Sequence, residues 1–340
     1  MKHLNSKSTQ LFLGILFCSS IPFWANDQYQ IHIATLIGIY WVLVSGLNLV
    51  VGFTGQLSIG HVGLLSIGSY AFAILAGKLG FDPYLSMLVS GCLGGLCGLM
   101  LGLPSLRLPG FYFAMATMAF SLIVNELVLA QGDLTGGGIG LAGPLFPAPF
   151  ESPIGFYYFV LAIATLFTWA SLNIVRSMWG RALISIRDSE VAAQAMGVPI
   201  FRAKLIVFVF SGFAAGISGA LFASLQSYIT PDTFVFELSL FFFVCIIIGG
   251  KGSILGPFLG TVVLTALPEL AAPLAKLGNL FYGILLLIVV LVIPEGIGRL
   301  ADMFIQKIRP RLVKTEPMKP DLSRLAQTLV TYSDTKRGQK

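Results

Sequence analysis

The sequence predicts an all-α fold, a polytopic bundle of eight to ten transmembrane helices whose two termini lie in the cytoplasm. Of the 340 residues, 56% are hydrophobic and only 11% are charged, and the mean hydropathy is +0.87. A soluble domain carries about a quarter charged residues, so a water-soluble protein is excluded. Apolar runs separated by short polar breaks recur along nearly the whole chain, and the basic residues gather in alternate breaks. This pattern is typical of a protein that crosses the membrane many times.

Ten runs are candidate spans, because a helix needs about 20 apolar residues to cross the hydrocarbon core. The first and eighth runs are short, and the ninth contains three prolines, so a broken or re-entrant segment is the alternative there. Losing two adjacent spans would leave eight. The ten runs are 11–24, 31–51, 57–77, 84–103, 111–131, 154–175, 205–227, 234–250, 254–275 and 280–298.

The chain is expected to divide into three parts. Residues 1–30 carry the first span, and the bulky Phe23 argues against cleavage there as a secretory signal, so this span is expected to be retained. Residues 31–312 form the transmembrane domain. Residues 313–340 are polar and are expected to form a cytoplasmic extension, whose basic residues either meet anionic lipid headgroups or stay solvated.

The charges predict the orientation. With the N-terminus inside, nineteen of the 21 lysines and arginines fall on the inner side, and only Lys78 and Lys276 lie outside. Cytoplasmic loops are enriched in basic residues, so this distribution favours an even number of spans and cytoplasmic termini. It also accounts for the net charge of +6 without a nucleic-acid partner. The outer loops instead hold acidic residues, namely Asp27, Asp82, Asp133, Glu151, Asp232 and Glu237.

Glycine recurs at four-residue spacing in three of the candidate spans. In lipid, small residues at this spacing let two helices approach closely, so these faces are predicted to be packing seams. The residues are Gly94, Gly98 and Gly102 in the fourth span, Gly212, Gly216 and Ala220 in the seventh, and Gly252, Gly256 and Gly260 around the ninth.

The stretch GFTGQLSIGHVG, residues 52–63, combines four glycines with polar side chains at membrane depth. Either its backbone is irregular and lines a translocation path, or it is a tight cytoplasmic turn. Gln56, Ser58 and His61 are the candidate path residues, although a histidine that packs between helices and bonds a neighbour is the commoner case. Glu126 in the fifth span is a further path candidate, and reaching to the outer interface is its alternative.

The longest inner loop, within 176–204, contains GRALISIRDSEVAAQAMGVPIFRAK. Its mixture of charged and apolar residues predicts a short amphipathic helix that ends at Gly197 and Pro199. Such a segment either docks onto a partner or rests on lipid. The candidate docking residues are Arg181, Arg187, Asp188, Glu190, Ala192, Ala193 and Gly197.

No motif in the sequence predicts an enzyme. The stretch GGKGS, residues 249–253, has Cys245 where a phosphate-binding loop needs glycine and Gly252 where it needs serine or threonine. Zinc-protease, nucleophile-elbow and diphosphate motifs are absent as well. We therefore expect no catalytic residues, no metal site and no cofactor in this chain.

Five blocks in order, within residues 40–298, make the chain resemble the integral membrane permease subunits of branched-chain amino acid ABC importers. Five blocks in one order are a specific resemblance. They are GQLSIGHVG (55–63), LRLPGFYFAMATMAF (106–120), TGGGIGLAG (135–143), GRALISIRDSEVAAQAMG (180–197) and IGGKGSILGPFLG (248–260).

The resemblance implies a multi-pass subunit of the bacterial inner membrane. Its partners would be a paralogous permease subunit, two cytoplasmic ATPase subunits that bind the ATP, and a periplasmic substrate-binding protein. Glu190, Ala192, Ala193 and Gly197 match the family's coupling-helix pattern, which would seat on an ATPase subunit. A sister permease for urea or another small amide is the alternative within this class. An autonomous secondary transporter is the alternative outside it, but such a protein has no need of a coupling loop.

Overall fold

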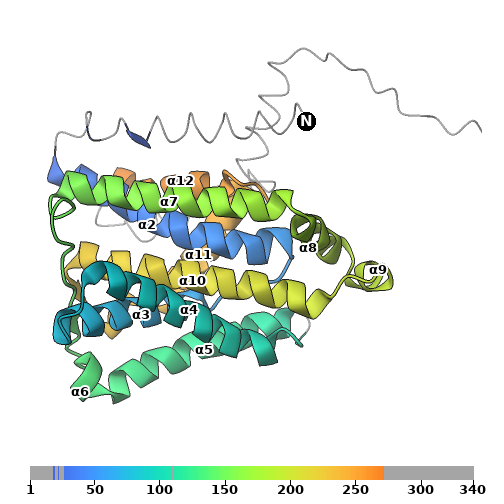
Figure 1. Cartoon of the computed structure of the whole chain (residues 1–340), viewed down its shortest axis with the longest axis horizontal. Coiled ribbons are helices and arrows are strands. Elements are labelled where there is room, and N and C mark those ends of the chain that lie inside the picture. Colours follow the sequence, from blue (N-terminus) through green and yellow to red (C-terminus); the bar gives the residue numbers. More distant parts are fainter. Residues whose placement is uncertain (1–17, 20–21, 23–26, 109, 272–340) are drawn as a thin grey trace, which may run out of the picture. The chain divides into compact units, whose positions relative to one another are not determined.

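The computed structural model describes residues 18–19, 22, 27–108 and 110–271, with side chains described up to residue 266. Long helices lie side by side in one bundle, with the short helices α8 and α9 at one end and α6 at the other (Figure 1). The first candidate span is described at only three positions. The tenth span, 280–298, and the tail, 313–340, lie outside the described residues.

Seven helical segments in the described part of the chain are long and apolar enough to cross a membrane, and they confirm candidate spans two to eight. The helix that corresponds to the ninth span is shorter. The helical elements are α2 (Gln28–Asn48) with its π-helical continuation η1 (Leu49–Phe53), α3 (His61–Phe72) with η2 (Ala73–Lys78), α4 (Pro83–Ser105), α5 (Phe111–Ala130), α6 (Gly132–Thr135), α7 (Pro153–Arg176), α8 (Met178–Asp188), α9 (Glu190–Ala195), α10 (Ile200–Gln226), η3 (Pro231–Thr233), α11 (Phe236–Gly249) and α12 (Gly256–Ala271).

Local capping determines where several helices begin. Asp82 precedes Pro83 at the start of α4, and its carboxylate accepts hydrogen bonds from the next two free backbone amides. Proline has no backbone N–H, so at the first helical position it leaves no donor unsatisfied, and the combination of Asp82 and Pro83 favours the start of a helix. α10 begins directly after Pro199, five residues earlier than hydropathy predicts, so Arg202 and Lys204 belong to its first turns rather than to the loop. Hydropathy marks only the lipid-embedded part of a helix and misses a polar extension of it.

α10 is the centre of the bundle and packs against α4, α3 and α2. The contact with α4 is made by glycines, as the spacing predicts. A Cβ atom on Gly94 would lie 2.5 Å from the carbonyl oxygen of Gly212 and 2.8 Å from Cα of Gly216. Across the other seam, Cβ atoms on Gly249 and Gly260 would overlap the backbones of Gly256 and Cys245 respectively. The backbones of facing helices are therefore in direct contact.

We expect Gly94→Ala to destabilise the protein by about 1 to 3 kcal/mol, because its methyl group meets backbone atoms that can yield only if α4 and α10 separate. The measurement is thermal unfolding of the purified protein in detergent. Gly95→Ala is the matched control, since its Cβ would lie 3.5 Å from the nearest atom, an ordinary contact distance. Equal melting temperatures for the two variants would contradict the seam.

Segments that the charge pattern assigns to one side of the membrane do meet at one end of the bundle. At the α6 end, β1 (Leu141–Ala142) pairs antiparallel with β2 (Tyr228–Ile229). Lys78 at the same end donates hydrogen bonds to the carbonyl oxygens of Asp133 and Leu134, at 2.9 and 2.8 Å. The alternation of the spans is thus consistent with the expected topology, whereas the cytoplasmic location of the termini stays a prediction.

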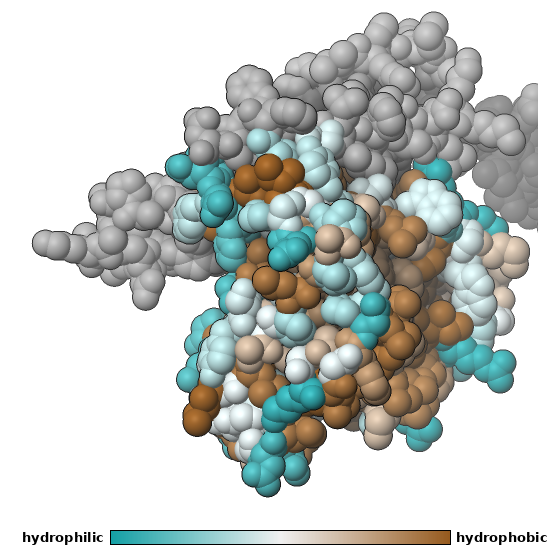
Figure 2. All heavy atoms as spheres, turned by 60° about the vertical axis from the view of Figure 1, so that its left-hand side comes forward, coloured by the Kyte–Doolittle hydropathy of each residue, from teal (hydrophilic) through white to brown (hydrophobic). Residues whose placement is uncertain are grey.

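The flanks of the bundle expose apolar side chains. Figure 2 turns the α6 end toward the reader and shows hydrophilic residues over this end, with hydrophobic residues continuing along the side of the body. An apolar flank of this kind is what a hydrocarbon environment requires. The exposed residues include Leu96 and Met100 on α4, Leu122, Ile123 and Leu127 on α5, and Leu166 and Trp169 on α7.

Candidate functional site at the α8–α9 end

The segment between α7 and α10 folds into two short helices rather than the single helix predicted. The hydroxyl of Ser177 accepts a hydrogen bond from the backbone amide of Trp179 and begins α8. Ser189 has an extended backbone that ends α8, and its hydroxyl accepts from the amide of Ala192 and begins α9. The predicted end at Gly197 is confirmed, because this glycine has φ of 80°, in the left-handed region.

α8 is amphipathic, as expected, and buries its apolar face in the protein. Leu183 and Ile186 are buried in a cluster that also contains Leu49, Phe53 and Phe208. The helix therefore packs against η1, which continues α2, and against α10.

α9 projects at the tip of this end of the bundle (Figure 1). Ala193 is buried in the same cluster as Leu183 and Ile186, and Ala192 is exposed. The two largest apolar side chains point away from the protein, with Val191 81% exposed and Met196 84% exposed. Large apolar side chains exposed on a short segment at the end of a membrane protein suit an interaction with another protein.

An ion pair ties α9 to α10. Lys204 Nζ donates to Glu190 Oε1 at 2.6 Å, and the side chains are 6% and 56% exposed respectively. A cation as buried as Lys204 needs an acceptor, so the pair holds the start of α9 against the first turns of α10.

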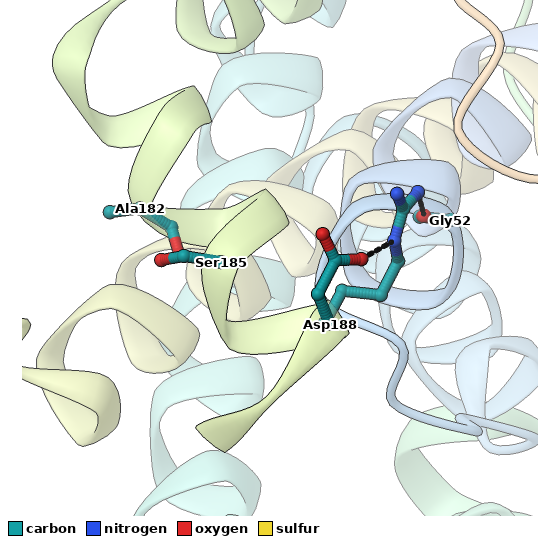
Figure 3. A network of polar contacts seen from close by, with 5 residues as sticks. Gly52, Ala182, Ser185 and Asp188 are labelled. Carbon is teal, nitrogen blue, oxygen red and sulfur yellow. Dashed lines mark hydrogen bonds and ion pairs between the residues drawn. The ribbon is translucent and has the colours of Figure 1, made fainter. Parts of the chain in front are cut away.

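Arg187, at the end of α8, connects this segment to the glycine-rich turn after α2. Its Nη1 donates to the carbonyl oxygen of Gly52 at 3.2 Å, and its Nε lies 3.4 Å from Asp188 Oδ1. Figure 3 shows the end of α8 with Asp188 beside the turn that carries Gly52. Arg181, on the same helix, is exposed and has no hydrogen bond or ion pair among the described residues.

The turn that receives Arg187 also meets the loop between α11 and α12. The side-chain amide of Asn48 donates to the carbonyl oxygen of Ser253 at 2.8 Å and accepts from the backbone N–H of Gly252 at 3.4 Å. We call Asn48, Gly52, Gly55, Gly252 and Ser253 the glycine junction. Asn48 was not predicted as a functional residue, although a lone amide at the end of an apolar span beside a glycine-rich stretch is a signal that points to one.

The segment from Thr54 to Gly60 has irregular backbone and is largely buried, Gln56 included. Ser58 Oγ lies 2.9 Å from His61 Nδ1, and His61 Nε2 lies 2.7 Å from Ser211 Oγ on α10. We call Ser58, His61 and Ser211 the histidine junction. His61 is only 1% exposed and is bonded on both nitrogens, as in the packing alternative. A role in the path would require α3 and α10 to separate here.

The structure does not bring Glu126 to these residues. Glu126 lies on the outward face of α5 between the exposed Leu122 and Leu127. It has no hydrogen bond or ion pair in the described part of the chain. Of the four candidate path residues, Ser58 and His61 are in contact, Gln56 lies in the preceding turn, and Glu126 is on a separate helix face.

A cavity of about 520 Å³ opens at the opposite, α6 end, and the sequence analysis did not find it. The first two turns of α2 contribute Gln28 and His32, and the loop before α7 contributes Glu151. None of these three has a hydrogen-bond partner among the described residues. Phe146 and Phe156 form part of the apolar wall. A cavity of this size and lining suits a small amphipathic solute.

No group of three or more metal-ligating side chains that could hold an ion occurs in residues 18–271 as far as they are described. The polar groups at the α8–α9 end form hydrogen bonds that join helices. These hydrogen bonds connect the exposed α8–α9 segment to the transmembrane helices, an arrangement that suits the transfer of movement between them.

Comparison with known proteins gives one family. A family model described as the permease component of branched-chain amino acid transport systems matches residues 29–291. The high-affinity branched-chain amino acid transport system permease protein LivM of Escherichia coli strain K12 is 30% identical over 317 residues, covering 85% of this chain and 74% of LivM.

Permeases for other solutes are similar to the chain as well. The autoinducer 2 import system permease protein LsrC of Enterobacter sp. strain 638 is 26% identical, covering 74% of this chain and 69% of LsrC. The L-arabinose transport system permease protein AraH of Escherichia coli strain K12 is 26% identical, covering 65% of this chain and 69% of AraH. No solved structure matches the chain.

Proposed function

The chain belongs to the family of permease components of branched-chain amino acid transport systems, and from this premise we propose that it moves leucine, isoleucine and valine inward as one subunit of an ATP-driven importer. It is a multi-pass protein of the bacterial inner membrane. In the proposed complex, the chain performs no covalent chemistry. ATP is bound and hydrolysed by two cytoplasmic ATPase subunits.

The observation that carries this proposal is the construction of the α8–α9 end. α9 exposes Val191 and Met196, and it is tied to the transmembrane helices through the Glu190–Lys204 ion pair. An autonomous secondary transporter needs no such projecting segment. We therefore assign α8–α9 as the coupling segment that an ATPase subunit holds, with Arg181, Asp188 and Gly197 at its surface.

The proposed mechanism is alternating access. Closure of the ATPase pair on ATP displaces α9, and the Glu190–Lys204 pair passes this displacement to α10. α10 carries Ser211 of the histidine junction, so its tilt separates α10 from His61 and Ser58. The buried polar groups there, together with Gln56, would then become accessible to the solute. Hydrolysis of ATP restores the closed packing.

The other partners follow from the same premise. A paralogous permease subunit would complete the path, and a periplasmic binding protein would deliver the solute at the α6 end. The outer loops at this end are acidic, which suits docking to a surface rich in lysine and arginine. Membrane lipid would cover the remaining apolar flanks.

The choice of branched-chain amino acids rests on LivM, which is 30% identical, against 26% for the arabinose permease. Urea or another small amide is the alternative within the importer class. In such systems the binding protein makes most of the selection, so the permease alone carries a weak signature of its cargo.

The test is purification of the tagged chain from its native membrane, followed by transport in liposomes. We expect an ATPase pair, a second permease and a binding protein to co-purify or to reconstitute an active complex. Uptake of labelled leucine should require ATP and should be inhibited by isoleucine and valine, but not by urea or arabinose. Transport by the chain alone without ATP would refute the importer, and inhibition by urea or arabinose alone would refute the cargo.

A further inference from the structure

One side chain at the end of α8 lies across two glycine loops that are distant in sequence. Arg187 donates a hydrogen bond to the carbonyl oxygen of Gly52. A Cβ atom on Gly55 would lie 3.1 Å from Arg187 Cγ, and a Cβ atom on Gly252 would lie 3.0 Å from Arg187 Nη1. The methylene groups therefore cover the first loop, and the guanidinium group reaches the second.

Each of the two loops has a glycine close to the Arg187 side chain. Gly55 and Gly252 each have φ of 75°, in the left-handed region that residues with a Cβ rarely adopt. Any other residue at either position would be strained and would press on Arg187. The glycines thus serve two requirements at once, the turn itself and the close approach of the arginine.

The two loops are also fastened to each other. A Cβ atom on Gly52 would lie 2.5 Å from the backbone nitrogen of Gly252, and Asn48 hydrogen-bonds both Gly252 and Ser253. The contacts of the glycine junction therefore hold the last turn of α2 against the loop between α11 and α12. Arg187 adds α8 as a third member.

The glycine junction lies where the backbone departs from regular α-helix. α2 passes into the π-helical turn η1, which contains Gly52, the acceptor of the Arg187 hydrogen bond, and π-helical turns are frequent at functional sites. The loop from Gly250 to Ser253 joins α11 to α12 without helical structure of its own except a single turn. A displacement of the glycine junction can therefore move the ends of α2 and α11 without breaking the hydrogen bonds inside either helix.

We propose that Arg187 is a positioning residue that holds the coupling segment against the glycine junction. We call its contacts with Gly52, Gly55 and Gly252 the Arg187 clasp. Through the clasp, movement of α8 is transmitted to the inner ends of α2 and α11. This route is separate from the Glu190–Lys204 pair, which leads to α10. The inference rests on the proposed function for its transport consequence. The clasp itself is a property of this chain alone.

Arginine is suited to this position for a physical reason. The planar guanidinium group carries five N–H donors in a rigid fork, so it can donate to Gly52 and to Asp188 while its Nη1 stays close to Gly252. Lysine has a single compact head and cannot span the same contacts.

The first experiment measures the clasp without any partner. Amide hydrogen exchange is followed in the purified permease for Arg187→Gln and for the matched control Arg181→Gln, on the same helix. We expect exchange at residues 49–56 and 250–253 to become about tenfold faster in Arg187→Gln, because a charge-assisted contact that holds both loops is lost. Arg181→Gln should leave both loops unchanged. Equal exchange in the two variants would overturn the clasp, whatever the protein transports.

The second experiment measures the consequence in the reconstituted complex, as leucine imported per ATP hydrolysed. In Arg187→Gln this ratio is expected to fall about fivefold while the ATPase subunits still co-purify. Asn48→Ala, at a buried position, should lower the same ratio, and Arg187→Lys should give an intermediate value. An unchanged ratio, or loss of the ATPase subunits together with activity, would overturn the transmission role. Failure of the wild-type chain to associate with ATPase subunits would instead refute the proposed function and leave the exchange result to decide the clasp.

Discussion

We expect ATP-dependent leucine uptake to be lost in the double variant Val191→Glu, Met196→Glu, although the protein should fold normally. Both side chains are exposed on α9 and make no contribution to the core, so melting in detergent should be unchanged. Burying two such side chains in an ATPase subunit contributes about 3 to 6 kcal/mol, and two carboxylates at the interface remove it. We expect association with the ATPase subunits to weaken about a hundredfold or more. The measurements are co-purification and uptake in liposomes.

The control for this variant is Ile139→Glu. Ile139 is 79% exposed but lies in the loop at the opposite end of the bundle. The same type of substitution there should leave association with the ATPase subunits unchanged. If the α9 variant keeps its ATPase subunits, α9 does not hold them and the assignment of the coupling segment is wrong.

The second large effect is expected for His61→Leu. The substitution removes both hydrogen bonds of the histidine junction and leaves the hydroxyl groups of Ser58 and Ser211 without this partner in a buried environment. A buried polar group left without a partner costs about 1 to 3 kcal/mol, so the loss of unfolding free energy should be about 2 to 4 kcal/mol. Equilibrium unfolding in mixed detergent micelles measures it.

His32→Leu is the matched control, because His32 lies on α2 and has no hydrogen-bond partner among the described residues. Its stability should stay close to that of the unmodified protein. Equal losses in the two variants would mean that the histidine junction contributes nothing specific.

The path hypothesis requires a separate measurement. Replacing Gln56, Ser58 and His61 together with alanine should reduce uptake by more than the loss of folded protein accounts for. If uptake per folded complex is unchanged, these residues hold helices together and do not meet the solute.

Much of the fold could be predicted from the sequence. Spans two to eight are confirmed, because long apolar runs have few alternatives to a helix in lipid. The glycine seams were predictable for a related reason, since spacing of four residues places small side chains on one helix face. The boundaries were less accurate. α3 begins at His61 rather than near residue 57, because a run of apolar and polar residues after Gly55 takes irregular backbone.

The structure of the α8–α9 segment was predicted in part. Its helical character and its end at Gly197 were predicted, but the division at Ser189 was not, because a single serine between charged residues gives no strong signal. The partner of Arg187 is Gly52, 135 residues earlier, and no local pattern connects the two. Asn48 itself could have been noticed locally, but its partners Gly252 and Ser253 lie 204 and 205 residues later and have no local pattern in common with it.

The sequence by itself determined that this protein crosses the membrane, where most spans lie, which helix faces are small enough to touch, and which family it resembles. Hydropathy and glycine spacing are local properties, and each helix satisfies its own backbone in lipid. The tertiary structure decided which polar groups meet: Arg187 with Gly52, Asn48 with the loop after α11, and His61 with Ser211. Many packings of the same helices satisfy the local pattern, and only the contacts across helices distinguish one from another.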